Sequence, residues 1–186
     1  MQARLVRSRP GTRGVTASPA RLAHVAAGAI DVEALASVYT VVFREPPYSE
    51  PDASDLRRRL PIHAERPGFR LVTASVDDRV VGFAYGYTGE GRGRWIERLA
   101  AQLGTATAGR PLGGHLVLAE LAVLPSVRGR GIGATLLDAM LRDRAEPRVL
   151  LQTHDGDTPA MRLYERAGFR RLAAMPPDVA LIRDLP

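Results

Sequence analysis

The order of apolar and polar positions divides the chain into helix-like and strand-like segments. A helical period starts after Asp31 and stops at Pro46-Pro47, because proline cannot continue a helix. A second helical pattern follows, capped by Asp52 or Ser54, and Pro61 is expected to shorten or kink it. The apolar positions are Val32, Leu35, Ala36, Val38, Tyr39, Val42 and Phe43 in the first helix, and Leu56 and Leu60 in the second.

Strand-like stretches lie between clusters of turn residues. The tripeptide Asp77-Asp78-Arg79 separates two of them and predicts a hairpin. Strand pairs followed by alternating helix and strand predict a mixed sheet with helices on both faces. The expected strands cover residues 21–25, 69–76, 80–87, 115–124, 148–153, 169–172 and 179–182.

Length and composition narrow the class of protein. A chain of 186 residues suits one domain, which we place at residues 20–186. Cysteine is absent, which excludes thiolate catalysis and disulfides and suits a cytoplasmic protein. No apolar run reaches 18 residues, so no membrane span is predicted. The four histidines show no metal-ligand spacing, so no metal is expected.

Basic residues give the chain a net charge of +6, and every one of the 26 is arginine. This excess is typical of a protein that contacts nucleic acid or an anionic membrane, but it also suits a protein that binds a phosphorylated ligand. Residues 1–19 are rich in arginine and lack a periodic pattern, which predicts a flexible tail rather than a transit peptide.

Residues 88–114 interrupt the strand pattern. Two Gly- and Arg-containing stretches flank a helical pattern from Trp95 to Leu103, which carries the only tryptophan. Long connections of this kind are usually functional or disordered. We interpret residues 88–114 as an insertion, either a lid over a binding site or passive decoration. An RNA-binding role is disfavoured, because this short Arg/Gly run lacks interleaved aromatic residues.

The most informative segment runs from residue 116 to residue 142. An apolar strand leads into Arg128-Gly129-Arg130-Gly131-Ile132-Gly133, and a helix follows at once. Glycine lets the backbone approach a ligand closely, and the free N–H groups at a helix N-terminus attract phosphate. A GxGxxG dinucleotide pattern and a Walker loop are both absent.

A second motif lies downstream in residues 158–169, TPAMRLYERAGF. Together with Arg128-x-x-Gly131-x-Gly133, in the same order and at a similar separation, it resembles the GNAT superfamily (GCN5-related N-acetyltransferases). The resemblance covers about residues 20 to 184. It implies an α/β (α+β) fold of GNAT type, with a mixed, mostly antiparallel central sheet flanked by helices on both faces.

The resemblance also implies a ligand and a set of roles. Acetyl-CoA, and thus coenzyme A, would be held by backbone groups in the strand and by the loop that follows it. Tyr164 would protonate the leaving sulfur. Thr158 stands where the family often has asparagine, and this departure puts a contact to the pantetheine arm in doubt. The expected cofactor-binding residues are Leu121, Ala122, Val123, Arg128, Gly129, Arg130, Gly131, Ile132, Gly133, Ala134 and Thr158.

Acyl transfer to an amine needs a neutral amine, and alkyl amines have a pKa near ~10. Glu120 is the first candidate for a general base, because it is an ionisable residue in an otherwise apolar strand. The alternative is a strand carboxylate that faces solvent or pairs with an arginine. His154, just after another strand, is the second candidate, whereas His115 is expected to be structural.

Acceptor recognition is less clear from the sequence. The rigid corner around Pro46-Pro47 and the insertion are expected to wall the acceptor site, and the substrate-binding candidates are Phe43, Tyr48, Tyr87, Trp95 and His154. The predicted function is direct, ternary-complex transfer of acetyl to an amine of a small molecule, peptide or protein. The alternatives are a non-catalytic acyl-CoA-binding module and a protein bound to RNA. Dimers are common in the family, so a homodimer is one expected form.

Overall fold

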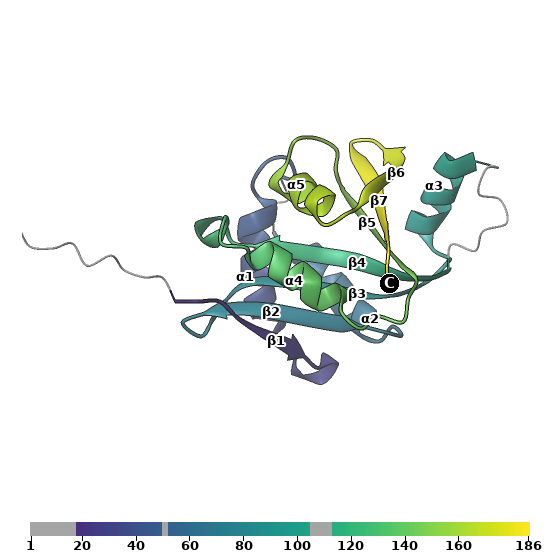
Figure 1. The fold of residues 1–186 in the computed structure, drawn as a ribbon. Helices are drawn as coiled ribbons and strands as arrows, with labels where there is room; N and C mark the ends of the chain where they lie inside the picture. Colours follow the sequence, from purple (N-terminus) through teal and green to yellow (C-terminus); the bar gives the residue numbers. More distant parts are fainter. Residues whose placement is uncertain (1–17, 50–51, 105–112) are drawn as a thin grey trace, which may run out of the picture.

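The computed structural model describes residues 18–49, 52–104 and 113–186, which form one seven-stranded sheet in the order β1-β2-β3-β4-β5-β7-β6 (Figure 1). Neighbouring strands are antiparallel except β4 and β5, which are parallel. The predicted fold class is confirmed. The strands are β1 Arg21–Val25, β2 Arg70–Val76, β3 Arg79–Glu90, β4 Gly113–Val123, β5 Arg148–His154, β6 Arg170–Met175 and β7 Asp178–Asp184.

Helices cover both faces of the sheet. Helices α1 (Val32–Phe43) and α2 (Ser54–Ala64) pack on one face of β2 to β4, and α4 (Ile132–Leu141) lies on the opposite face (Figure 1). Helix α5 (Pro159–Arg166) extends the α4 layer, and α3 (Arg94–Leu103) packs against β6. Two short 3-10 turns, η1 (Ala27–Ala29) and η3 (Pro125–Val127), complete the described elements.

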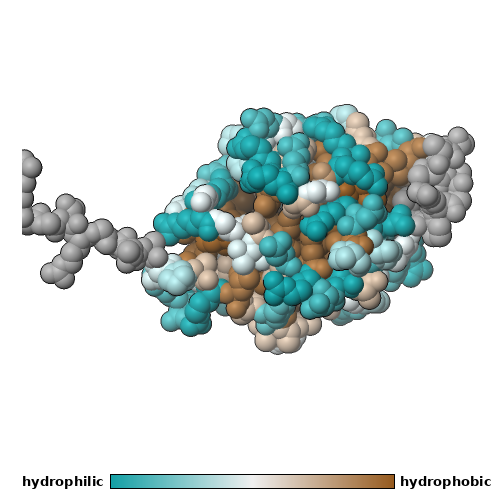
Figure 2. Space-filling model, viewed as in Figure 1, coloured by the Kyte–Doolittle hydropathy of each residue, from teal (hydrophilic) through white to brown (hydrophobic). Residues whose placement is uncertain are grey.

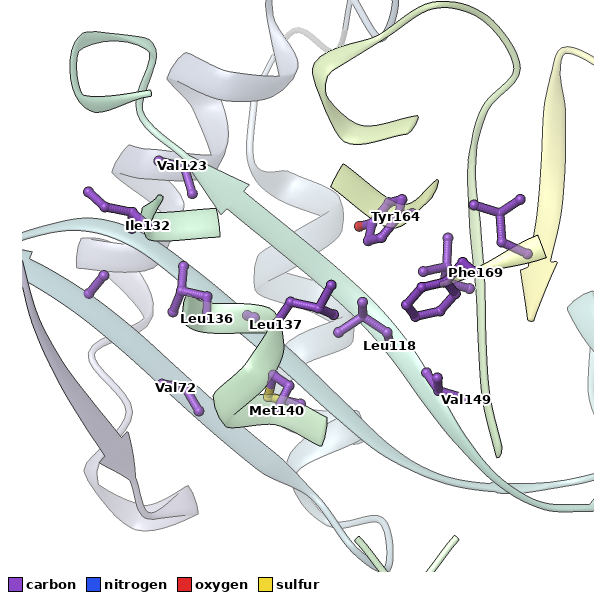
Figure 3. Packing of buried hydrophobic residues seen from close by; sticks show 14 of the residues in the cluster. Val72, Leu118, Val123, Ile132, Leu136, Leu137, Met140, Val149, Tyr164 and Phe169 are labelled. Atoms are coloured by element: carbon purple, nitrogen blue, oxygen red, sulfur yellow. The ribbon is translucent and has the colours of Figure 1, made fainter. Parts of the chain in front are cut away.

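Two main apolar clusters form the core. One lies between the sheet and helices α4 and α5, where Leu136, Leu137 and Met140 of α4 pack on Val72 and Leu118 (Figure 3). The other lies under α1 and α2 and contains Tyr39, Leu56 and Phe83 among its members. Strand β5 serves both faces: Val149 and Leu151 join the first cluster, whereas Leu150 packs with α3 residues Ile96 and Leu99. Helix α3 therefore lies on the same face as α1 and α2.

Element boundaries differ from the prediction at β3. The strand continues three residues past Tyr87 to Glu90, and β4 begins at Gly113. Gly89 permits this extension, because a Cβ there would lie 2.4 Å from the His115 ring. Part of the expected 88–114 insertion is thus ordinary sheet, and its helix is α3; residues 105–112 lie outside the described residues. Most of the expected 1–19 tail, residues 1–17, does so as well.

Other local predictions match the structure. Asp77 and Asp78 both have positive φ angles, 48° and 60°, as the tight β2–β3 hairpin requires. The Asp31 carboxylate accepts a hydrogen bond from the Ala34 amide at the start of α1. The Asp52 carboxylate accepts from the Ser54 amide just before α2. Pro61 neither ends nor shortens α2, which continues to Ala64.

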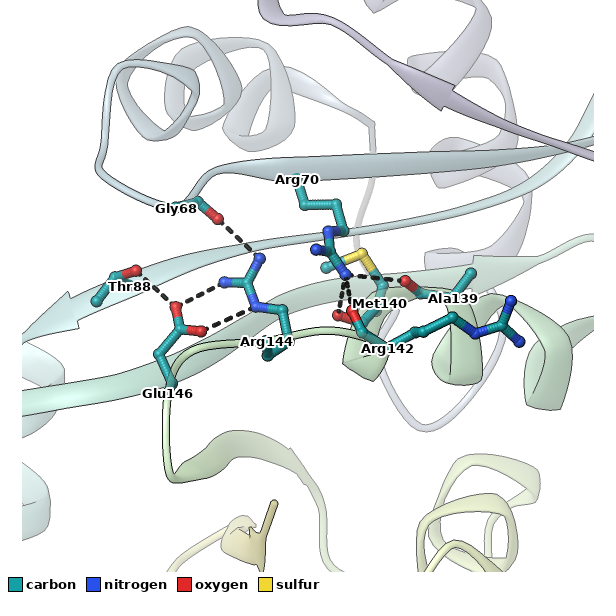
Figure 4. A network of polar contacts seen from close by, with 8 residues as sticks. All are labelled: Gly68, Arg70, Thr88, Ala139, Met140, Arg142, Arg144 and Glu146. Atoms are coloured by element: carbon teal, nitrogen blue, oxygen red, sulfur yellow. Dashed lines mark hydrogen bonds and ion pairs between the residues drawn. The ribbon is translucent and has the colours of Figure 1, made fainter. Parts of the chain in front are cut away.

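A buried polar network ties three chain segments together at one end of the sheet (Figure 4). The Arg144 guanidinium pairs with the Glu146 carboxylate at 2.7 Å and donates to the Gly68 carbonyl, while the Thr88 hydroxyl donates to Glu146. Nearby, Arg70 donates to main-chain carbonyls at the end of α4. A cation there also complements the helix dipole. We call the Arg144–Glu146 pair with Thr88 and Gly68 the latch.

The surface and the helices give two further findings. On the face that carries α4, apolar residues are interspersed among polar ones rather than gathered in one large patch (Figure 2). Within the described residues, no helix combines the length and the hydrophobicity needed to cross a membrane.

Candidate active site

Strands β4 and β5 separate partway along their length, and this separation defines the candidate site. They pair only at Leu116↔Val149 and Val117↔Leu150, although β4 continues to Val123 and β5 to His154. Backbone groups of β4 after Val117 therefore have no strand partner on the β5 side. An edge of this kind offers N–H and C=O groups to an extended ligand.

A β-bulge on β4 sets which side chains face this site. Tyr85 is opposite Glu120 and Gly86 is opposite Leu118, so Ala119 is an extra residue in the ladder. Gly86 is required here, because a Cβ would lie 2.3 Å from the Val117 carbonyl oxygen. After the bulge, Ala122 points to the α1–α2 face and Leu121 points to the α4–α5 face, as the alternation in the sequence predicts.

The Arg/Gly loop places the start of α4 beside this strand edge. Gly131 is the N-cap residue in a left-handed conformation, with a φ angle of 79°. No side chain of the described residues caps the helix, and its first turn contains no acid. The N-terminal amides of α4 are thus available to an anion. Arg130, Ile132 and Thr135 also line a surface pocket of about 300 Å³.

The two arginines of the loop differ in their contacts. Arg128 donates to the Val123 carbonyl at 3.2 Å, and its Nη1 pairs with Glu45 at 2.8 Å. Its side chain therefore holds the end of β4 against the loop after α1. Arg130 instead lines the pocket, whose other side is formed by residues 18–20, Leu22 and Val76.

Tyr164 lies on α5 at the edge of the larger apolar cluster (Figure 3). Its ring packs on Phe169 with a centroid distance of 5.4 Å. Burial raises the pKa of Tyr164 well above its ordinary value of 10.0, and the neighbouring Tyr48 and Glu120 raise it further. Thr158 caps α5 as expected, because its hydroxyl accepts from the Met161 amide at 3.0 Å.

Glu120 is held by an arginine, the alternative that its sequence left open. Arg59 of α2 pairs with the Glu120 carboxylate at 2.7 Å, and the Glu120 side chain is only 9% exposed. Arg59 also contacts Asp55. The Glu120 carboxylate therefore has a fixed cationic partner inside the site. The catalytic role predicted for Glu120 stays a prediction.

His63 of α2 lies beside this pair. Its Nδ1 is 3.3 Å from the Tyr85 hydroxyl. Burial, together with Arg59 and Arg66, lowers the pKa of His63 to about 4. Burial also raises the pKa of Tyr85 far above its ordinary value, with a further contribution from Glu120. His63 and Tyr85 are therefore both neutral near pH 7.

The structure brings three of the five acceptor-site candidates together. The rings of Phe43 and Tyr48 lie 5.0 Å apart, and the rings of Tyr48 and His154 lie 6.5 Å apart. Tyr87 lies elsewhere, 4.6 Å from the His63 ring and under the guanidinium of Arg66. Trp95 on α3 donates its indole N–H to Gln152 at 2.6 Å. Contact of these five side chains with an acceptor stays a prediction.

Sequence reasoning missed four polar residues near the site. Arg59 and His63 are four residues apart on α2, a spacing that places both on one helix face and could have revealed them. Gln152 shares a strand face with His154, by simple alternation along β5. Asp178 gave no local signal, because it reaches His154 only through the antiparallel pairing of β5 with β7.

In the described part of the chain, no group of three or more His, Asp or Glu side chains is arranged to hold a metal ion.

Comparisons with known proteins agree with this geometry. The chain is 37% identical over 100 residues to a GCN5-like protein acetyltransferase of Mycobacterium tuberculosis, covering 48% of each chain. It is 34% identical over 123 residues to the mycothiol acetyltransferase of Acidothermus cellulolyticus, covering 62% of this chain and 34% of that one. The matches thus span about half or less of these curated relatives.

Solved structures show the same fold at low sequence identity. An acetyltransferase from Thermus thermophilus matches with a TM-score of 0.64 and 19% identity, covering 89% of this chain and 97% of that one. The PaiA N-acetyltransferase of Thermoplasma acidophilum, solved in complex with coenzyme A, matches with a TM-score of 0.62 and 14% identity, covering 89% and 99%. The model of the acetyltransferase (GNAT) family matches residues 35–169. With the separated strands and the uncapped α4 terminus, this match leads to one conclusion: the chain belongs to the GNAT acetyltransferase family.

Proposed function

We propose that this protein is an acetyl-CoA-dependent N-acetyltransferase that transfers acetyl directly to an amine of a small molecule, peptide or protein. One observation carries the proposal. The unpaired edge of β4 leads straight into an uncapped helix N-terminus, so an extended thioester-bearing arm and its phosphate groups have adjacent sites.

The residues present fit coenzyme A. Main-chain groups of Leu121 to Val123 would bind the extended arm, and the amides of residues 128–134 would bind the pyrophosphate. Side chains at Gly129 and Gly131 would strain the loop, because both residues have positive φ angles. Acetyl-CoA would supply an activated acyl group as its thioester.

Tyr164 is suited to assist the leaving sulfur. Its raised pKa keeps the hydroxyl protonated at neutral pH, so it always has a proton to donate. An ordinary thiol has a pKa near ~8.5, so full proton transfer from this phenol to a thiolate is uphill. The hydroxyl therefore acts mainly by donating a hydrogen bond to the developing negative charge.

The acceptor amine attacks without a covalent enzyme intermediate on cysteine, because the chain has none. A ternary complex follows from this route. The base that accepts the amine proton is one of the ionisable groups beside the strand edge, with Glu120 and His154 as the candidates from the sequence.

Two experiments, carried out one after the other, test the proposed function. Thermal unfolding in the presence of acetyl-CoA, CoA or ATP measures whether the site prefers CoA compounds. A ligand at about 100 times its Kd raises the free energy of unfolding by roughly 2.7 kcal/mol. A panel of amines with thiol detection then measures turnover. The Tyr164→Phe variant should bind acetyl-CoA normally and lose about a hundredfold in kcat.

The outcomes separate the rival functions. A CoA-specific shift with no turnover on any amine would favour an acyl-CoA-binding module. The absence of any shift with CoA would refute the assignment of the strand edge and loop. Unchanged kcat in the Tyr164→Phe variant at saturating substrate would remove Tyr164 from the mechanism.

A further inference from the structure

A chain of polar side chains links α3 to the ends of β5 and β7. The Trp95 indole N–H of α3 donates to the Gln152 Oε1 of β5 at 2.6 Å. The Gln152 Nε2 then donates to the Asp178 Oδ2 of β7 at 2.5 Å. These contacts join three elements that lie far apart in the sequence, on the face of the sheet that carries α3.

The direction of these hydrogen bonds is fixed by their chemistry. An indole N–H can only donate, and an ionised carboxylate can only accept. The amide between them must therefore present its oxygen to Trp95 and its nitrogen to Asp178. Gln152 thus has one orientation, and it holds the Asp178 carboxylate in place through one of its two oxygens.

The second oxygen of Asp178 faces a histidine. Its Oδ1 is 3.8 Å from the His154 Nδ1, and both side chains are about a quarter exposed, at 28% and 27%. This distance is longer than a hydrogen bond but within the range of an ion pair. A carboxylate on the Nδ1 side favours the tautomer with its proton on Nδ1, which leaves the Nε2 lone pair available.

A tyrosine and a second carboxylate also lie near His154. Tyr48, from the corner after α1, meets the His154 ring edge-on at 6.5 Å. Asp155, the next residue along the chain, pairs with Arg171 of β6 through both carboxylate oxygens. Tyr48 also acts electrostatically on Tyr164 of α5, whose pKa it raises. His154 therefore lies beside the acceptor-side corner, with Asp178 on the Nδ1 side of its ring.

We propose that His154 is the general base of the reaction and that Trp95, Gln152 and Asp178 are positioning residues that orient it. The inference rests on the proposed function. His154 Nε2 accepts the proton of the acceptor amine, directly or through one water. The amine nitrogen forms the new C–N bond as the thioester C–S bond breaks, and the electron pair leaves with sulfur, toward which Tyr164 donates.

Glu120 then has a different task from the one its sequence suggests. Its carboxylate is taken by Arg59 at 2.7 Å, whereas Asp178 is left with one oxygen for His154. The Glu120 charge raises the pKa of Tyr164 and so helps to keep that hydroxyl protonated. Helix α3 likewise supports the base, because its Trp95 donates the first of the hydrogen bonds that lead through Gln152 to Asp178.

The first test is the pH dependence of kcat/KM in wild type and three variants. His154→Gln should lower kcat at least a hundredfold and remove the acidic limb of the profile. Asp178→Asn should lower kcat about tenfold, because the imidazole loses the carboxylate that orients it. Trp95→Phe removes only the indole N–H and should act in the same direction, more weakly, with KM for acetyl-CoA unchanged.

Asp155→Asn is the matched control, because it removes the same charge next to the same histidine from a carboxylate that Arg171 already holds. It should lower kcat less than Asp178→Asn does. An equal loss of kcat in the two variants would overturn the positioning role of Asp178. The acetyl-CoA thermal shift, retained in every variant, confirms that each one is folded.

Two results would overturn the assignment of the base. If His154→Gln kept both its rate and its pH profile, His154 would not be the base. If Glu120→Gln alone removed the acidic limb, Glu120 would hold that role. Failure of the proposed function looks different, because wild type would then bind CoA compounds and turn over no amine at all.

Discussion

Two arginine–glutamate ion pairs with low solvent exposure lie in very different surroundings. In the latch, Arg144 and Glu146 are 5% and 8% exposed, and each has further fixed partners in Gly68 and Thr88. In the candidate site, Arg59 and Glu120 are 27% and 9% exposed and sit beside ionisable side chains. The distance from the arginine Nη2 to the glutamate Oε1 is 2.7 Å in both pairs.

The difference lies in what each pair does to its neighbours. Within the latch, a hydroxyl and a carbonyl match the hydrogen-bonding groups of the ion pair. The latch thus joins the end of β3 and the loop between α2 and β2 to the loop before β5 (Figure 4). The Arg59–Glu120 pair changes the pKa values of His63, Tyr85 and Tyr164 around it. A saturated ion pair is thus structural, whereas a pair set among titratable groups also shifts the pKa values of those groups.

The largest expected effect comes from breaking the latch. Glu146→Ala leaves the Arg144 guanidinium buried without its counter-charge, so the free energy of unfolding should fall by about 3–5 kcal/mol. Urea denaturation measures this loss. The rate of the remaining folded enzyme at saturating substrates should be unchanged. A loss below 1 kcal/mol would contradict the structural role, and Asp184→Ala, at an exposed pair, is the matched control.

Acid should weaken the two regions in different pH ranges. His63 has a folded pKa of about 4 against an ordinary 6.5, so the unfolded chain binds its proton first and stability falls as pH drops from 6.5 toward 4. We expect a loss of about 2 kcal/mol in this window, reduced from the full pKa difference because the ring is only half-buried. Denaturation curves at pH 7, 5.5 and 4.5 for wild type and His63→Phe measure this loss of stability. Equal losses in the two proteins would show that His63 is not its cause.

The latch should respond only at lower pH. Burial raises the pKa of Glu146, but the bonds from Thr88 and Arg144 outweigh burial, so the pKa lies below the ordinary 4.5. Its stabilising contribution is therefore present above pH 4.5 and is lost as pH falls through the folded pKa. In the Glu146→Gln variant, the free energy of unfolding should depend less on pH than in wild type, and only in that acidic range.

Neutralising the site pair should separate activity from stability. Glu120→Gln leaves Arg59 with Asp55 as a partner, so stability should fall by only about 1–2 kcal/mol. The rate should fall by less than about tenfold, because the Glu120 charge supports Tyr164 without taking the amine proton. Parallel denaturation and steady-state kinetics make the comparison, and a rate loss as large as that of His154→Gln would contradict this division of roles.

The smallest expected effect concerns the helix that carries Tyr164. Thr158→Ala removes the hydroxyl that caps α5, so stability should fall by about 1 kcal/mol. Thr158→Asn should retain the cap, because asparagine is an equally good N-cap residue. A decreased affinity for CoA in Thr158→Ala, with affinity kept in Thr158→Asn, would show that this position also serves the cofactor.

Much of the fold follows from patterns a few residues long. The period of the residues after Asp31 sets α1, and the pair Asp77-Asp78 sets the β2–β3 hairpin, because capping and turn chemistry act locally. The prediction ended β3 too early, because Thr88 to Glu90 form a strand only through their pairing with β4. The expectation that Pro61 shortens α2 was wrong, because the helix continues to Ala64 while Leu56 and Leu60 pack in the core.

The sequence by itself determined the family of this protein, because its two motifs consist of glycine spacing and helix capping, which shape the backbone locally. Only the tertiary structure decided how the ionisable side chains are paired. Arg59 reaches Glu120 across 61 positions of the chain, and Asp178 faces His154 across a strand pairing. Long-range contacts of this kind decide which charged partner each group meets, and that partner cannot be read from a residue's immediate neighbours.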